Sequence, residues 1–441
     1  MELNLFIEKL FEGAKAAGYE AAEIAYQKGD SFDVSVKGGE IVDYNVASTL
    51  DFTFRALVNG KMGYASTQVF DEDALDLLLE SVKMNAGLIE NEDERFIFEG
   101  SDHYETVNIY NPAIDELTAA QKIEMAKELE KKAISLDPRA GQVEMANVFT
   151  MANEKRIANT RGLDVSRKGN AIGVSVAVIA QEGEKTAVGS GFAIKRDPAQ
   201  LDLDKICRDA VDDAVAGLCA KPVPSGEYRI VMRPDIMASM LACFSPVFSA
   251  DYAQKGMSLL AGREGDVVAS EQVTIIDDPL MAEGLACSPF DGEGVATKTR
   301  EVVSAGRLNT LLHNLKTAKK QGVETTGNAS WGGAGVTPSN FYLKPGDMSR
   351  DEVYAQAGDG LLIIEVNGLH AGANQISGDF SLGAKGYVIR EGRVAEAVNQ
   401  ITVAGNFFQM LKDIEAVGSD LEMMQSIGAP TTLIKSLKVA G

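Results

Sequence analysis

Histidine and cysteine are scarce in this sequence. Its 441 residues include three histidines, at positions 103, 313 and 370, and four cysteines, at positions 207, 219, 243 and 287. The cysteines are spaced without any C-x-x-C pair. This usage predicts buried, reduced thiols in a cytoplasmic protein.

Long hydrophobic runs and basic tracts are also missing. No stretch approaches about 18 uninterrupted apolar residues, so no transmembrane span is expected. The amphipathic start of the chain, residues 1–18, lacks the basic and then apolar regions of a signal peptide. The balance of 42 basic against 64 acidic residues gives a net charge of −22. It argues against direct nucleic-acid binding and indicates a solvated acidic surface.

The residues that are present predict an α+β fold in two or three parts. The clearest linker, KPVPSG at 221–226, separates two sheet-plus-helix regions from a mainly β domain. We place the N-terminal region at 1–110, the central region at 111–221 and the C-terminal domain at 227–441. Short strands between glycine turns predict a barrel or a sandwich for the last of these.

The first two regions repeat one pattern. Each begins with an amphipathic helix, continues with strands and closes with a hairpin around a glycine, at 59–60 and 182–183. The residues at 28–30, Lys-Gly-Asp, predict a break between two strands. The second long helix starts at Thr118, which forms a capping-box pattern with Gln121. The repetition indicates a weak internal duplication, whose two halves could join in one sheet.

A glycine-rich stretch, Val366–Gly386, dominates the C-terminal domain (VNGLHAGANQISGDFSLGAKG). The apolar runs on both sides predict a loop between two strands, with glycine where φ is positive or another backbone approaches closely. Short polar side chains hold such a loop by hydrogen bonds to its own backbone. A loop of this kind lines a site or an interface, and a tight β-meander is an equally good reading.

Carboxylates at 277, 278, 291 and 293 are candidates for a metal site. Asp277 and Asp278 are adjacent in an expected strand, however, so their side chains point to opposite faces and cannot chelate together. A structural turn is the favoured interpretation.

Two further candidate functional residues are a histidine and the tryptophan. His370 could act as a base oriented by Asp379, but no nucleophile accompanies the pair, and a hydrogen-bonded structural histidine is favoured. Trp331, the single tryptophan, stands in a glycine-rich loop. It could contact a peptide or a subunit, or serve as a buried anchor.

Several motifs together resemble the TldD/PmbA family, also called modulators of DNA gyrase, and are closer to its PmbA (TldE) branch. They are GMSLLAGR at 256–263, DDP at 277–279, SPFDGEG at 288–294, G-x-L at 306–308, TTGNA at 325–329, GLHAGAN at 368–374 and SGDFSLG at 377–383. The resemblance implies a bacterial or archaeal protein related to metallopeptidases. In the TldD branch, His-Glu-x-x-x-His on a helix and a Cys near the C-terminus hold zinc.

This chain departs from that pattern at the metal site. The corresponding positions read Leu241-Ala242-Cys243-Phe244-Ser245-Pro246, and no cysteine follows Cys287. We therefore expect no metal here, and we interpret Leu241 and Phe244 as core residues of a helix that has lost its site. Zinc is expected only in a TldD-type partner.

The resemblance and the missing ligands favour a non-catalytic subunit that pairs with a TldD-type peptidase and helps to hold peptides or unfolded protein. Alone, the chain is expected to form a homodimer. The expected peptide or interface contacts are Gly368, His370, Gly372, Asn374, Gly378, Asp379 and Trp331. Two alternatives are a peptidase with a divergent site, where His370, Asp379 and Asp291 are the residues to test, and a binding protein that modulates DNA gyrase.

Overall fold

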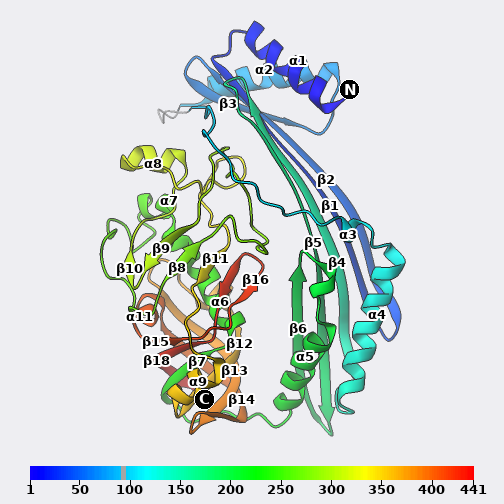
Figure 1. Cartoon of the computed structure of the whole chain (residues 1–441), viewed down its shortest axis with the longest axis vertical. Helices are drawn as coiled ribbons and strands as arrows, with labels where there is room; N and C mark the ends of the chain where they lie inside the picture. Colours follow the sequence, from blue (N-terminus) through cyan, green and yellow to red (C-terminus); the bar gives the residue numbers. More distant parts are fainter. Residues whose placement is uncertain (91–95) are drawn as a thin grey trace.

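The structure is a computed structural model that describes residues 1–90 and 96–441. It is an α+β protein, as the sequence predicts, and one long antiparallel sheet stands beside a C-terminal part that contains a barrel (Figure 1). No helix among the described residues is long and apolar enough to cross a membrane.

The long sheet is built from the first two regions of the chain. Their helices are α1 (Leu3–Ala16), α2 (Glu72–Leu88), α3 (Pro112–Asp115), α4 (Ala119–Leu136) and α5 (Leu203–Gly217), with the 3-10 turn η1 (Pro198–Gln200); their strands are β1 (Ala21–Lys37), β2 (Glu40–Val58), β3 (Lys61–Thr67), β4 (Gln142–Asn159), β5 (Asp164–Glu182) and β6 (Lys185–Lys195). The strand order is β3-β2-β1-β4-β5-β6.

This order confirms the internal duplication at the level of topology. Each half has a helix, three meandering strands and a closing helix, and the halves join where β1 pairs with β4. The helix α4 starts at Thr118 with the expected capping box to Gln121. The helices of this sheet bury two separate apolar clusters. Helices α1 and α2 pack at one end of the sheet, and α4 and α5 pack at the other (Figure 1).

The strands of this sheet are longer than the sequence predicts. The expected break at Lys28–Asp30 lies inside β1, because β1 is paired along this stretch with β2 on one side and β4 on the other. Backbone hydrogen bonds on both edges outweigh the weak strand preference of Gly29. Strands β2, β4 and β5 likewise run without interruption through residues 47–50, 153–154 and 169–170.

The C-terminal part combines a barrel with a small second sheet. Its helices are α6 (Pro234–Phe244), α7 (Ala250–Gln254), α8 (Leu315–Gln321), α9 (Arg350–Ala357), α10 (Leu369–Gly372) and α11 (Phe407–Lys412), with the 3-10 turn η2 (Ser245–Phe248). Its strands are β7 (Gly226–Met232), β8 (Ile275–Asp277), β9 (Arg300–Ser304), β10 (Arg307–Leu308), β11 (Phe341–Leu343), β12 (Gly360–Asn367), β13 (Asp379–Arg390), β14 (Arg393–Asn406), β15 (Ile414–Val417), β16 (Glu422–Met424), β17 (Ile427–Ala429) and β18 (Thr432–Ala440).

Five of these strands close into a barrel. The sequence did not decide between a barrel and a sandwich for this domain. They follow one another as β14-β13-β12-β7-β18, and β18 pairs back to β14. The other sheet has the order β10-β9-β8-β11-β17-β16. Against expectation, β13 already begins at Asp379, inside the predicted loop.

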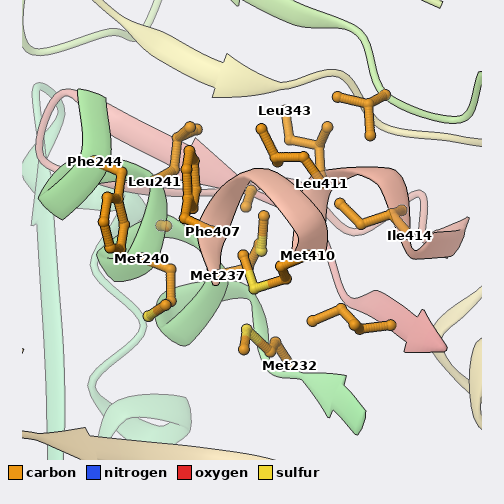
Figure 2. Close-up of a cluster of buried hydrophobic side chains, with 14 of the residues drawn as sticks. Met232, Met237, Met240, Leu241, Phe244, Leu343, Phe407, Met410, Leu411 and Ile414 are labelled. Carbon is orange, nitrogen blue, oxygen red and sulfur yellow. The ribbon is translucent and has the colours of Figure 1, made fainter. Parts of the chain in front are cut away.

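Helix α6 lies at the centre of the largest apolar cluster (Figure 2). Pro234 occupies its first turn, where a missing N–H costs nothing. Leu241 and Phe244 are buried in this core, as predicted, and the Phe244 ring stacks on Phe407 with centroids 4.4 Å apart. All four cysteines are free. Cys207 and Cys287 are buried as predicted, Cys243 is only partly buried, and the prediction is wrong for Cys219, which is exposed.

Candidate functional site

The glycine-rich stretch forms a loop from residue 368 to residue 378 between β12 and β13, and the loop contains the single turn α10. Gly368 and Gly378 adopt φ of 89° and 84°, which L-residues with side chains rarely adopt. Gly372 has an ordinary φ, but a Cβ there would lie 2.4 Å from the carbonyl oxygen of Ser381. Positive φ and close approach therefore each explain part of the glycine pattern.

Short polar side chains hold this loop in place. The Asn374 side-chain oxygen accepts hydrogen bonds from the N–H groups of Ile376 and Ser377. The Asp379 carboxylate accepts hydrogen bonds from the Asn406 amide at 2.9 Å and the Ser377 hydroxyl at 2.9 Å. Because these donors favour the charged form, the pKa of Asp379 is lowered.

The loop forms one wall of an open groove of about 1110 Å³, and α6 forms the other. From α6 the groove is lined by Ser239, Ala242 and Cys243. The Gln375 amide donates a hydrogen bond of 2.8 Å to the Cys243 carbonyl oxygen and ties the loop to the end of the helix. The structure thus joins two features that the sequence presents separately, the glycine-rich loop and the helix of the altered metal motif.

Leu241, Ala242 and Pro246 stand where the family motif has its first His, its Glu and its second His. These three positions do not share one face of α6. Leu241 is 1% exposed and points into the core, where Figure 2 shows it beside Phe407. Ala242 is exposed and lines the groove. Pro246 lies beyond the end of the helix, in η2.

The residues around this groove do not fit a zinc ion. Cys243, His370 and Asp379 all line it, yet nowhere in the part of the chain that the structure describes do three His, Cys, Asp or Glu side chains group closely enough to hold a metal. Burial raises the pKa of the Cys243 thiol, which disfavours the thiolate that binds zinc. Among the described residues, no hydrogen bond links His370 to Asp379, so the pair lacks the geometry of a base and its orienter.

Asp291 lies at a different place, at the junction between the C-terminal part and the long sheet. Its carboxylate accepts hydrogen bonds from the N–H groups of Glu293, Val295 and Ala329, at 2.9 to 3.0 Å. Burial nevertheless raises its pKa to about 6. The structure therefore separates Asp291 from the groove that contains His370 and Asp379.

Glu293 and Asp291 belong to a buried charged cluster, and the sequence did not predict its other members, Glu23 and Arg55. Burial, followed by the nearby charge of Asp291, raises the pKa of Glu293 to about 7. Its carboxylate accepts a hydrogen bond of 2.8 Å from the Leu315 N–H. From the long sheet, Arg55 faces this cluster and donates to Glu23 at 2.8 Å. The available sequence signal was Glu23 itself, an acid in an otherwise apolar strand segment.

The remaining candidates make contacts within the fold. Asp277 is buried and accepts hydrogen bonds from the Asn328 amide and from the backbone and hydroxyl of Ser339. Asp278 accepts from the Leu280 N–H, as in a turn. Trp331 packs against Ile157, Leu163 and Phe290, and the Lys155 ammonium lies 4.7 Å from its ring centroid.

The sequence matches family models of the PmbA/TldA metallopeptidases in three segments. Domain 1 matches residues 22–86, the central domain matches 112–218 and the C-terminal domain matches 225–441. Together they cover most of the chain and include the groove.

Individual relatives extend over the full length. A protein from Haemophilus influenzae named as a homologue of metalloprotease PmbA is 26% identical, with 100% of this chain and 96% of the relative covered. A crystal structure from Thermotoga maritima, described as a candidate modulator of a DNA gyrase, is 34% identical, covers 100% of both chains and superposes with a TM-score of 0.94. The crystal structure of TldE from Thermococcus kodakarensis, at 22% identity, shares the fold with a TM-score of 0.91 over 99% of this chain and 100% of that one. The chain therefore belongs to the PmbA/TldD family, as its motifs indicated.

Proposed function

We propose that this chain is the non-catalytic subunit of a peptidase pair. It would assemble with a TldD-type zinc peptidase and help to hold a peptide or unfolded protein while the partner cleaves it. The observation that carries the proposal is on α6: the positions of the family's His-Glu pair hold Leu241, which is buried in the core, and Ala242, which lines the groove.

The groove suits a binding role. Its loop wall is held by its own hydrogen bonds and by Gln375, so little order has to be gained on binding. His370 and Asn374 are exposed along it and offer polar groups to a main chain. These features support contact with a peptide or with the partner subunit.

Co-expression with a TldD-type chain from the same organism tests the proposal. We expect the two chains to co-purify, and we expect the pair to cleave an unfolded substrate faster than either chain alone. The purified chain alone should be inactive. Failure to co-purify at micromolar concentration, with both chains folded, would contradict the pairing.

The same preparations test the two other functions. A peptidase with its own divergent site would be active alone and would lose activity when His370 or Asp379 is replaced. Modulation of DNA gyrase, suggested by the description of the Thermotoga maritima relative, would appear as direct binding to gyrase without any TldD-type chain.

A further inference from the structure

A cavity of about 470 Å³ lies between the helices α3 and α4 and the strands β1, β2 and β4 of the long sheet. The strand register places Val46, Phe32 and Thr150 side by side across these three strands, on one face of the sheet. The cavity shares no lining residue with the groove between α6 and the glycine-rich loop. It is therefore a separate feature, which the proposed function does not use.

The lining changes from buried to exposed across the cavity. Lys122 from α4 and Thr150 from β4 are each only 8% exposed, and Phe32 is equally buried. Ser48 and Met151, which also line the cavity, are exposed to solvent. A ligand can therefore enter past the exposed residues and reach the buried lysine.

The Lys122 ammonium is buried without a carboxylate partner. Its Nζ donates a hydrogen bond of 3.0 Å to the Thr150 hydroxyl and lies 4.5 Å from the centroid of the Phe32 ring. In the part of the chain that the structure describes, it forms no ion pair, and Asp115 acts on its charge only from farther away. Burying a charge without a counter-ion costs free energy. Burial accordingly lowers the pKa of Lys122, and the charge of Asp115 opposes this shift.

The two acids that line the cavity have other partners. The Asp115 carboxylate accepts hydrogen bonds from the Tyr110 hydroxyl and, at 3.1 Å, from the Asn170 amide. Asp30 is exposed and pairs with Lys28 at 3.4 Å. The buried ammonium is therefore the group in this cavity that lacks a counter-ion.

The buried part of the cavity offers donors that a ligand could use. An ammonium has more N–H donors than the single bond to Thr150 uses. The Thr150 hydroxyl accepts that bond, and no acceptor for its own proton is found among the described residues. Lys122 also lies near the start of α4, which begins at Ala119, so the helix dipole adds positive potential. Donors of this kind bind an anionic group most strongly.

We propose that this cavity binds a small monocarboxylate, whose carboxylate lies between Lys122 and Thr150 and whose apolar body lies against Phe32. Ile114 and Val46 extend the apolar lining. The volume and the lining, mainly apolar with a few polar groups, are those of a small-molecule site. The C-terminal carboxylate of a peptide offers the same chemistry. The proposal holds whether or not the chain serves a TldD-type partner.

Isothermal titration calorimetry of the full chain tests the site with sodium hexanoate and with its neutral analogue 1-hexanol. We expect hexanoate to bind, and we expect 1-hexanol to bind about tenfold more weakly or worse. Lys122→Met keeps an apolar side chain of similar length and should weaken hexanoate binding by about tenfold or more. Lys127→Met is the matched control, because Lys127 is on the same helix, pairs with Glu124 and lies outside the cavity. Equal binding of hexanoate by natural protein and Lys122→Met would overturn the proposal.

A second variant decides the question if Lys122→Met fails to fold. Ser48→Trp places a large ring at an exposed lining position and should block hexanoate, so natural affinity in this variant would refute the site. N-acetyl-leucine and N-acetyl-leucinamide separate the two sources of the carboxylate. Tighter binding of N-acetyl-leucine than of hexanoate, lost in the amide, would assign the site to peptide C-termini. Failure of both hexanoate and N-acetyl-leucine to bind the natural protein would refute the proposal.

Discussion

At the scale of single residues, Glu293 is the clearest source of a pH-dependent stability. It is 8% exposed, and burial raises its pKa to about 7 from an ordinary value of 4.5. The native state therefore holds a proton that the unfolded state releases between these values. Stability from this group is fully present below about pH 4.5 and is lost as the pH rises toward 7.

Replacing this residue should reveal that loss. We expect Glu293→Gln to leave the free energy of unfolding almost unchanged at pH 5 and to raise it by about 2 kcal/mol at pH 8, where the natural carboxylate is charged and buried. Urea unfolding at the two pH values measures the difference. Glu144→Gln, at an exposed position, is the control. Equal effects of Glu293→Gln at both pH values would show that ionisation of the buried carboxylate does not destabilise the native state.

His370 is the second residue whose role can be decided by substitution. It is exposed on the groove and makes no hydrogen bond to Asp379 among the described residues. We expect His370→Ala to keep peptidase activity of the reconstituted pair within about tenfold, which is about 1.4 kcal/mol of activation free energy. If turnover disappears while the pair still assembles, His370 takes part in catalysis and the non-catalytic assignment fails.

At the scale of elements, the glycine-rich loop should be sensitive where a side chain has no room. A Cβ at Gly378 would lie 2.6 Å from the Phe408 ring, and one at Gly372 would meet the Ser381 carbonyl. We expect Gly372→Val and Gly378→Val each to destabilise the chain by about 1–3 kcal/mol. Gly383→Ala is the matched control, since its nearest neighbour is 3.9 Å away. A control that lowers the urea midpoint as much as the valine variants would contradict this explanation.

The sequence predicted elements whose signals are local. Capping and periodicity predicted α4, and the repeated helix-and-hairpin order predicted the two halves of the long sheet. The loop prediction was wrong where a glycine allows two strands to pack closely. Gly386 was placed in a loop, yet it lies in β13, where a Cβ would meet the Leu362 carbonyl at 1.9 Å. The groove could not be predicted either, because Cys243 and Gln375 are 132 residues apart and only the closed barrel brings them together.

At the scale of the whole molecule, we expect the purified chain to hold no stoichiometric zinc. The helix that faces the groove offers Ala242 and Cys243, and burial keeps the Cys243 thiol protonated. Elemental analysis of the chain purified without chelators measures this. About one equivalent of tightly held zinc per chain would contradict it.

The most direct test of the non-catalytic role uses the reconstituted pair with a catalytically inactive partner, called the silent pair below. The glutamate of the partner's His-Glu-x-x-x-His motif is changed to Gln, so that any remaining cleavage must come from this chain. With the natural partner as the positive control, we predict that the silent pair assembles normally and that its cleavage of an unfolded substrate falls to background. Cleavage that persists in the silent pair, and that is lost when residues of this chain's groove are replaced, would show that this chain is itself the peptidase.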